Sequence, residues 1–299
     1  MTTAVIGQPI SRVDGRQKVT GRATYAAEFD VPGVAYAAIV RSTVANGRIA
    51  SIDSVLAERA SGVLAVLTHR NAPRLAYRSH KALVDPEFGE RLHVLQDDRV
   101  SHQGQPIALV IAATLEQAQY AATLVRATYG MEQAVTDIAR AEPVRPGHNQ
   151  TDQGERRPSE GRRGDPEAAL AAAEVKVDQS YVIPRENHNP IEMHATIAAW
   201  DGDRLTLWDK TQWVHNVADE IAAVFGIPPE NVRVISPFVG GAFGSGLRAW
   251  PHVTLAALGA RVAGRPVKLM LSRREMSTAL VTGPTRSSAS RSAHRATGA

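Results

Sequence analysis

The sequence Gly240-Gly241-Ala242-Phe243-Gly244-Ser245-Gly246 follows a β-branched run, Val232-Arg233-Val234-Ile235, and precedes an apolar, helix-like segment that begins near Trp250. Glycine loses more conformational freedom on folding than any other residue. Four glycines in seven residues at a strand-to-helix junction therefore predict a backbone that another group approaches closely. The candidates are a phosphate-bearing cofactor, a reacting centre, or only a tight turn.

The same loop formally matches a dinucleotide-binding fingerprint, because residues 244–249 fit the pattern G-x-G-x-x-G/A. However, the loop is too long for the tight turn that normally follows the first strand, and no acidic residue ends a second strand about 20 residues later. We therefore disfavour a nicotinamide site. Several backbone N–H groups at a helix start still suit an anion or a cofactor oxygen. Phe243, between Gly241 and Gly244, is expected to be presented rather than buried.

The composition is that of a globular protein. At 299 residues the chain is longer than one average domain, so two domains are expected. Its hydrophobic content of 43% is enough for an ordinary core. The net charge of +4 comes from scattered basic residues, which gives no nucleic-acid footprint. The sequence has no cysteine, so it holds neither disulfides nor an iron–sulfur cluster of its own.

No targeting or membrane segment is predicted. The first residues lack the basic region and apolar core of a signal peptide. No apolar run approaches the roughly 18 residues that a membrane span needs. We therefore expect a soluble, cytoplasmic protein, which is periplasmic only if a partner subunit carries it there.

Hydrophobic patterns predict an α+β fold with two folded regions, residues 1–140 and 165–276. In the first region strands are expected at 34–40, 47–53, 63–68 and 106–113, and helices at 54–60 and from Thr114 to near Gly130. In the second, strands are expected at 175–183, 195–200, 204–208 and 232–235, and helices at 167–173, 213–225 and 253–262. The continuous apolar run of the strand at 106–113 implies that both of its faces are buried.

Two segments are not expected to fold. Residues 141–164 are rich in Pro, Gly and charged residues, which predicts a linker or a long surface loop. Residues 277–299 consist almost entirely of Ser, Arg, Ala, Thr and Gly without periodicity, so we expect a disordered low-complexity tail.

Two further motifs carry candidate site residues. His188, Glu192 and His194 share parity, so an extended chain would place them on one face, as in a metal-binding triad. Pro190 disturbs this register, and a hydrogen-bonded structural cluster is the favoured interpretation. In the second motif, Thr211 can cap the helix that follows, which would leave the amide of Gln212 in the first turn to hold an oxo group or a pterin.

Taken together, these residues resemble one family, the large molybdenum-cofactor-binding subunit of the xanthine dehydrogenase/aldehyde oxidoreductase hydroxylases. The resemblance extends, in order, from about residue 6 to about residue 276. It is carried by residues 12–26, which resemble the family's opening signature, by residues 104–110, 187–195 and 211–212, and by the loop at 240–244. The run at 187–195 is similar to one in bacterial enzymes with separate subunits.

The resemblance implies an N-terminal α/β hammerhead domain followed by the incomplete first part of a molybdopterin-binding domain. It implies hydroxylation of aldehydes or N-heterocycles with water as the oxygen source. The cofactor would be molybdenum–molybdopterin in its cytosine dinucleotide form, and partner iron–sulfur and FAD subunits would carry the electrons away. Gln212, Gly240, Gly241, Phe243 and Gly244 would be the cofactor-binding positions, with Phe243 next to the substrate, and none of the chain's residues is assigned as a protein ligand to the metal.

The resemblance also implies a missing part. Family members are more than twice this length, and their catalytic base is a glutamate near the C-terminus. We therefore expect a truncated or frameshifted product that is inactive alone. Two alternatives remain open, a metal-dependent hydrolase that uses His188, Glu192 and His194, and a non-catalytic fragment that binds the partner subunits.

Overall fold

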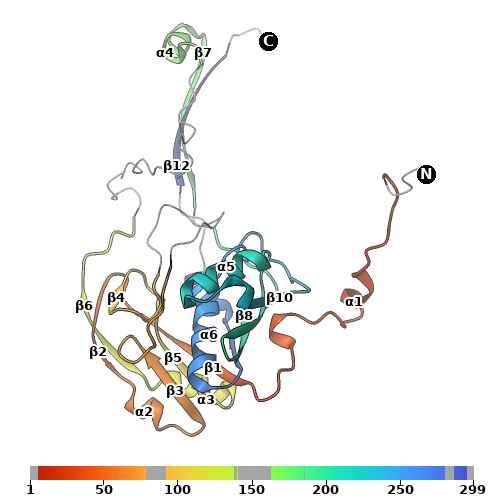
Figure 1. Ribbon diagram of the computed structural model, residues 1–299. Helices are drawn as coiled ribbons and strands as arrows, with labels where there is room; N and C mark the ends of the chain where they lie inside the picture. Colours follow the sequence, from red (N-terminus) through yellow and green to blue (C-terminus); the bar gives the residue numbers. More distant parts are fainter. Residues whose placement is uncertain are drawn as a thin grey trace. The chain divides into compact units, whose positions relative to one another are not determined.

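The computed structural model describes residues 6–78, 92–137, 140, 163–184, 186–279 and 286–294. Helices and strands are mixed, which confirms the expected α+β class (Figure 1). The chain divides into two units, one formed by residues 1–85, 91–133 and 188–280 and the other by residues 86–90, 134–187 and 281–299. Within the described ranges, every helix is too short or too polar to cross a bilayer.

The first unit holds most of the regular structure. Its strands are β1 (Ala35–Arg41), β2 (Gly47–Asp53), β3 (Val63–Thr68), β4 (Arg99–Val100), β5 (Pro106–Ala112), β6 (Arg126–Met131), β8 (Ala195–Asp201), β9 (Arg204–Asp209), β10 (Val232–Ile235) and β11 (Val267–Met270). Its helices are α1 (Gly15–Val19), α2 (Val55–Glu58), α3 (Leu115–Ala122), α5 (Val214–Phe225), α6 (Pro251–Ala263) and α7 (Arg273–Ala279), with 3₁₀ turns at Ala26–Glu28 and Pro229–Asn231. The second unit contains α4 (Pro166–Ala172), β7 (Val175–Ile183) and β12 (Arg286–His294).

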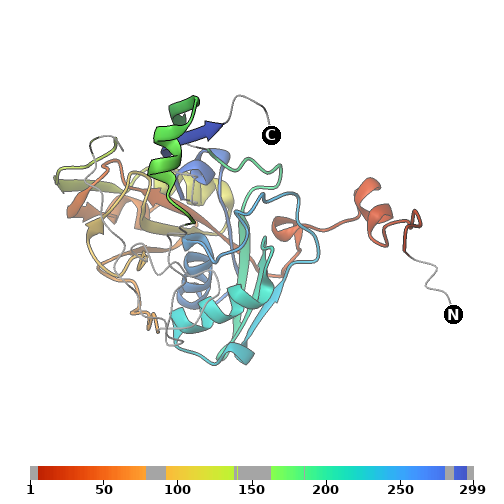
Figure 2. The same ribbon diagram turned by 90° about the horizontal axis from the view of Figure 1, so that it is seen from above.

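One seven-stranded sheet joins the two regions that the sequence analysis separates. Its strand order is β10-β9-β8-β11-β1-β5-β3. The joining strand is β11, which pairs in parallel with β1 and antiparallel with β8. The predicted boundaries at residues 140 and 165 therefore do not separate two sheets, and residues 188–280 share a unit with the N-terminal region. Helix α6 lies against the centre of this sheet, over β8, β11 and β5 (Figure 2).

Strand β5 is buried on both faces, as its sequence predicts. Leu109 and Ile111 belong to the core cluster that includes the buried faces of α5 and α6. Ala108 and Val110 point into a second cluster, built with β2, α2 and α3. Because successive side chains of a strand point to opposite faces, one apolar strand contributes to two cores.

The helix expected to run from Thr114 to near Gly130 is shorter than predicted. Its start is confirmed, since Thr114 and Gln117 form a reciprocal capping box. It ends at Ala122, and the next residues form β6, which pairs antiparallel with β2. The alanine-rich sequence continues the helical pattern, but pairing with a distant strand determines the conformation here.

The C-terminal segment also differs from the expectation of disorder. Helix α7 continues to Ala279, and β12 pairs with β7 along nine residues in an antiparallel register. Such pairing is made by backbone groups, so a Ser- and Arg-rich sequence can form it. Of the predicted linker, residues 141–162 lie outside the described residues.

Substitution of Gly259 by valine is expected to lower the free energy of unfolding by about 1–3 kcal/mol, because it overpacks the core between α6 and β5. A Cβ atom at Gly259 would lie 3.1 Å from Leu109 Cδ2 and 3.2 Å from Ile111 Cδ1. Urea denaturation measures the change, and Gly259→Ala should give a smaller loss. Equal stability of Gly259→Val and wild type would contradict this close packing.

Candidate functional site

The glycine loop connects the edge strand β10 to helix α6, as predicted. Pro251 occupies the first turn of α6, where its missing N–H costs no hydrogen bond. Two side chains of α5 hold the end of the loop. Asn216 Nδ2 donates to Leu247 O at 3.1 Å, and Glu220 Oε2 accepts from the backbone N–H of Ala249 at 2.9 Å. Neither residue is among those predicted from the sequence, although two polar residues four apart within an apolar helix face were a usable signal.

Glu192 clamps the start of the loop at Gly240. Glu192 Oε2 accepts from the N–H of Gly240 at 2.6 Å, and the N–H of Glu192 donates to Gly240 O at 3.1 Å. A Cβ atom at Gly240 would lie only 2.7 Å from Glu192 Cβ. The close approach predicted for this glycine is therefore made by the chain itself.

The middle of the loop is more open. A Cβ atom at Gly244 would have His188 Nε2 at 4.0 Å as its nearest neighbour, and Gly244 is exposed. Gly241 and Gly244 have φ angles of +91° and +95°. Between them Phe243 also has a positive φ, +54°, and its side chain is 73% exposed. A bulky residue in the left-handed region is rare, and such strain is concentrated at functional sites.

Replacement of Phe243 by asparagine is expected to raise the free energy of unfolding by up to about 1 kcal/mol, because asparagine tolerates the left-handed region and little apolar burial is lost. The buried Phe225 is the control, since Phe225→Ala should cost about 3–5 kcal/mol. Chemical denaturation distinguishes the two. A large loss of stability in Phe243→Asn would show that the ring supports the fold instead.

Gln212 lies beside the end of the loop. Its backbone N–H donates to Gly246 O at 2.8 Å, and its Oε1 accepts from the N–H of Gly246 at 3.2 Å. Thr211 is not the N-cap residue of α5, which is Trp213; its Oγ1 donates to Gly246 O at 2.9 Å and accepts from the backbone N–H of Trp213 at 3.0 Å. Gln212 therefore precedes the helix instead of lying in its first turn, and its exposed amide keeps its NH2 group as a donor.

His188, Glu192 and His194 do not form a metal site. The chain bends at residues 191–192, so the parity argument for an extended strand fails. Glu192 binds Gly240, whereas His194 Nε2 lies 3.1 Å from Ser245 Oγ. Among the described residues, no group of three His, Cys, Asp or Glu side chains is arranged to hold a metal ion. The hydrolase alternative thus loses its geometric basis, and Glu192 and His194 instead support the loop.

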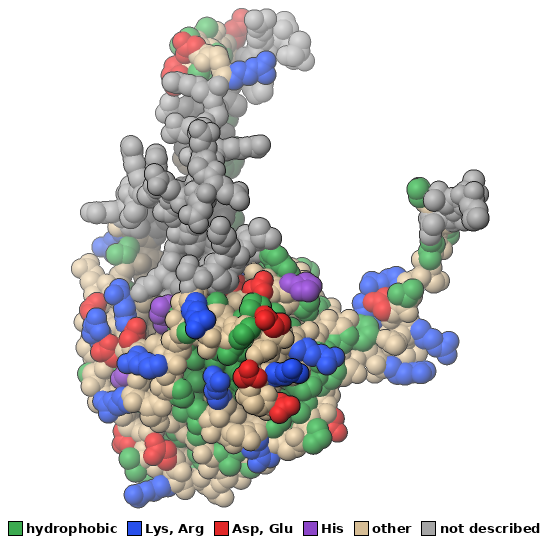
Figure 3. All heavy atoms as spheres, viewed as in Figure 1, with side chains coloured by type: hydrophobic (Ala, Val, Ile, Leu, Met, Phe, Trp, Pro, Cys, Tyr) green, Lys and Arg blue, Asp and Glu red, His purple; other side chains and the backbone are tan. Residues whose placement is uncertain are grey.

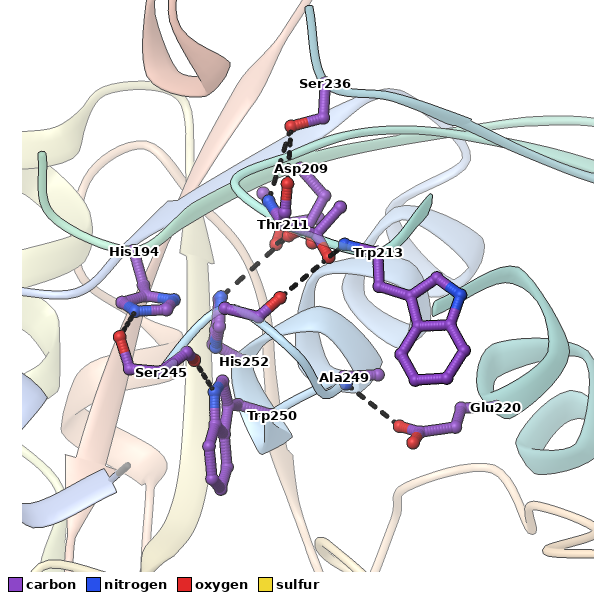
Figure 4. A network of polar contacts seen from close by, with 12 residues as sticks. His194, Asp209, Thr211, Trp213, Glu220, Ser236, Ser245, Ala249, Trp250 and His252 are labelled. Atoms are coloured by element: carbon purple, nitrogen blue, oxygen red, sulfur yellow. Dashed lines mark hydrogen bonds and ion pairs between the residues drawn. The ribbon is translucent and has the colours of Figure 1, made fainter. Parts of the chain in front are cut away.

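A buried polar network lies behind the loop (Figure 4). Ser245 Oγ donates to Ala242 O at 2.7 Å, and Trp250 Nε1 donates to Ser245 O at 2.5 Å. Asp209, at the end of β9, accepts from Thr196 Oγ1 at 2.5 Å, and its Oδ1 lies 4.0 Å from His252 Nε2. The network connects β8, β9 and α6 to the glycine loop.

Burial dominates the electrostatics of this network. It raises the pKa of Asp209 to about 7, although the hydrogen bond from Thr196 opposes the shift. It lowers the pKa of His252 to about 3 and that of His194 to about 2, with further lowering from neighbouring positive charges. Burial also lowers the pKa of Lys210 to about 8, against the charges of Glu192 and Asp209. Both histidines are therefore neutral at pH 7.

Charged side chains of both signs are mixed on one face of the molecule (Figure 3). On the face that Figure 3 shows, Lys and Arg side chains lie among Asp, Glu and hydrophobic side chains and form no continuous basic stripe in the described part of the chain. This distribution agrees with the small net charge of +4.

Comparison with known proteins defines the class. The family model described as "Aldehyde oxidase and xanthine dehydrogenase, a/b hammerhead domain" matches residues 20–133, and that of the "Molybdopterin cofactor-binding domain" matches residues 148–298. The chain is 38% identical over 273 residues to the aldehyde oxidoreductase molybdenum-binding subunit PaoC of Escherichia coli (strain K12), covering 90% of this chain and 35% of that protein. It is 33% identical over 271 residues to the putative xanthine dehydrogenase molybdenum-binding subunit XdhA of the same organism, covering 88% and 36%.

A solved structure supports the same class. Quinoline 2-oxidoreductase from Pseudomonas putida 86 superposes with a TM-score of 0.81 at 25% identity, over 96% of this chain and 37% of that one. The chain belongs to the aldehyde oxidase and xanthine dehydrogenase family of oxidoreductases, and its hammerhead domain is followed by part of a molybdopterin-binding domain. It spans about a third of the length of the curated relatives it matches.

Proposed function

We propose that this chain forms one wall of the molybdopterin site of a molybdenum hydroxylase that oxidises aldehydes or N-heterocycles with water as the oxygen source. One observation carries the proposal: the glycine loop presents Phe243, strained and 73% exposed, within the domain that the cofactor-binding family model matches. The strained backbone and the exposed ring of Phe243 do little to stabilise the fold, so contact with a ligand is the best explanation for both.

The residues present fit such a group. The backbone at Gly244 is open, since a Cβ there would meet only His188 Nε2 at 4.0 Å, and Gln212 offers an exposed amide donor. We propose that Gly241 and Gly244 contact the cofactor, that Gln212 donates a hydrogen bond to it, and that Phe243 packs on the flat substrate. Both backbone polar groups of Gly240 already bind Glu192, so we propose that Gly240 acts by anchoring the loop.

When bound, the molybdenum–pterin group would supply the redox centre that accepts two electrons from the substrate. The chain's residues would position the substrate and the cofactor against each other. We propose that the general base is a glutamate of the part that the longer relatives have in addition, so this chain alone would be inactive. We further propose the cytosine dinucleotide form of the cofactor, and iron–sulfur and FAD subunits as electron-accepting partners.

The test is cofactor binding by the full chain and two glycine variants. Gly244→Ala and Gly202→Ala both place a Cβ at a positive φ, +95° and +60°, with no clash within 3.4 Å, and only Gly244 lies in the proposed cofactor wall. Gly202 lies in the β8–β9 turn. We expect purified molybdopterin cofactor to bind wild type and Gly202→Ala alike and Gly244→Ala at least about tenfold more weakly, a difference of about 1.4 kcal/mol. Equal binding by all three, or no binding by wild type, contradicts the proposal, and aldehyde-dependent dye reduction by the loaded chain contradicts its inactivity.

A further inference from the structure

Unsatisfied polar atoms gather behind the glycine loop. In the described part of the chain, seven buried side-chain nitrogen and oxygen atoms have no hydrogen-bond partner, and six of them belong to His188, Glu192, His194, Lys210 and His252. Buried polar atoms are nearly always paired with protein or with ordered water. Such a concentration at one place therefore points to a polar occupant that these residues share.

Lys210 is the least expected member. It lies between Asp209 and Thr211, is only 2% exposed, and is among the largest fully buried side chains. Its backbone N–H donates to Ala195 O at 3.1 Å, but its Nζ has no hydrogen-bond partner among the described residues. A buried ammonium group without hydrogen bonds is strongly unfavourable, so this nitrogen requires a partner.

Glu192 offers the complementary atom. Its Oε2 accepts from Gly240, whereas its Oε1 is buried and makes no hydrogen bond of good geometry in the described ranges, although the backbone N–H of Ala26 also faces this carboxylate. The charges of Glu192 and Lys210 act on each other, yet no direct hydrogen bond or ion pair between these two described residues is formed. Two opposite charges that are close but not in contact are the usual setting for a bridging water.

His194 supplies a third contact. Ser245 Oγ donates its proton to Ala242 O, so it accepts from His194 Nε2–H. The neutral ring then has an unprotonated Nδ1, which is buried and lacks a donor in the described residues. One water can accept from Lys210 Nζ and donate to both Glu192 Oε1 and His194 Nδ1, which gives the three hydrogen bonds typical of a buried water.

We propose that a buried water site joins Lys210 Nζ, Glu192 Oε1 and His194 Nδ1, and that through this site Lys210 is a positioning residue for the glycine loop. Glu192 transmits the effect, because it holds both backbone groups of Gly240. Water fits better than an anion, since the carboxyl groups of Glu192 and Asp209 both face this cluster. Only the consequence for cofactor binding rests on the proposed function; the water site itself does not.

The direct test is a high-resolution crystal structure of the full chain. We expect an ordered water about 2.7–3.2 Å from all three atoms. A direct contact of Lys210 Nζ with Glu192 Oε1, a bound anion, or a dry cluster would each overturn the proposal. This test needs no cofactor, so its failure is distinct from failure of the proposed function.

The positioning role is tested with Lys210→Met, Glu192→Gln and the double variant. We expect Lys210→Met to lower the melting temperature by roughly 2–4 °C and to cost less in the Glu192→Gln background, which reveals coupling. We also expect carboxyl NMR to show a raised pKa of Glu192 in Lys210→Met, since the charges facing Glu192 are Lys210, Asp209 and Glu28. Lys176→Met, at a lysine that donates to Ala171 O, is the control and should leave the pKa of Glu192 unchanged.

Several results would refute this role. They are a stabilised Lys210→Met, additive effects in the double variant, and an unchanged titration of Glu192. Should Lys210→Met fail to fold, Lys210→Gln keeps a donor that can reach the water and allows the same titration to be measured. The charge of Lys210 also acts on Glu192 directly, so the titration tests the coupling of these two residues and the crystal structure tests the water.

Discussion

Replacement of Gly240 by alanine is expected to lower the free energy of unfolding by about 1–3 kcal/mol and to displace the loop that carries Phe243. The new Cβ would lie 2.7 Å from Glu192 Cβ, an atom next to the backbone that cannot move aside freely. The shift would also break the hydrogen bonds between Gly240 and Glu192, at 2.6 and 3.1 Å. Chemical denaturation measures the loss of stability, and the fluorescence of Trp250, which donates to Ser245 of the loop, reports the displacement.

Gly130 provides the matched control. It is an exposed glycine of β6 without a positive φ, and nothing lies within 4 Å of its Cβ position. Gly130→Ala should therefore be neutral or stabilising by about 0.4–1 kcal/mol. If the two alanine variants were equally stable, the clamp between Glu192 and Gly240 would not exist in solution.

Acidification below pH 6.5 is expected to destabilise the protein. His194 and His252 have folded-state pKa values of about 2 and 3, below the ordinary 6.5, so the unfolded state binds two more protons in this range. Asp209, with its pKa raised from 3.8 to about 7, has the opposite effect, because its folded state keeps a proton that the unfolded state loses. For these three groups the net difference between about pH 4 and 6.5 is about one proton, so their contribution to stability falls by about 1.4 kcal/mol per pH unit as the pH decreases.

Urea denaturation at a series of pH values measures this slope. His252→Gln removes one of the two histidines, so the opposite effects of His194 and Asp209 should nearly cancel. The contribution of these residues to the pH dependence of the unfolding free energy should then approach zero. Asp209→Asn keeps an acceptor for Thr196 and removes the opposing effect, which should make the slope steeper. The exposed His215→Gln serves as control. A slope that is the same in His252→Gln and wild type would show that His252 is protonated in the folded state.

Local sequence signals predicted the helices and strands best where the ends of an element depend only on neighbouring residues. The strands at 47–53, 63–68, 175–183 and 232–235 have their predicted bounds, because β-branched runs end at clear turn signals. The exposure of Phe243 also followed from its glycine neighbours.

The sequence could not show features that depend on distant contacts. Strand β6 and the place of β11 in the sheet depend on partners far away in the chain. The burial of Lys210 contradicts the usual position of lysine at the surface, and no local pattern announces it. Thr211 is not the N-cap residue because α5 begins at Val214 after Trp213, and the Thr211 hydroxyl binds both Gly246 O and the backbone N–H of Trp213.

The position of β11 has a consequence for biosynthesis. Ala35 of β1 pairs with Val267 of β11, so the middle of the large sheet is closed by two strands that lie far apart in the sequence. Such non-local pairing slows folding, because the long intervening segment must be ordered first. On the ribosome, β1 and β5 emerge long before β11, with one edge of β1 open to other nascent strands. This edge of the hammerhead region therefore lacks its partner until β11 has been synthesised, and we expect the nascent chain to be most prone to aggregation in that interval.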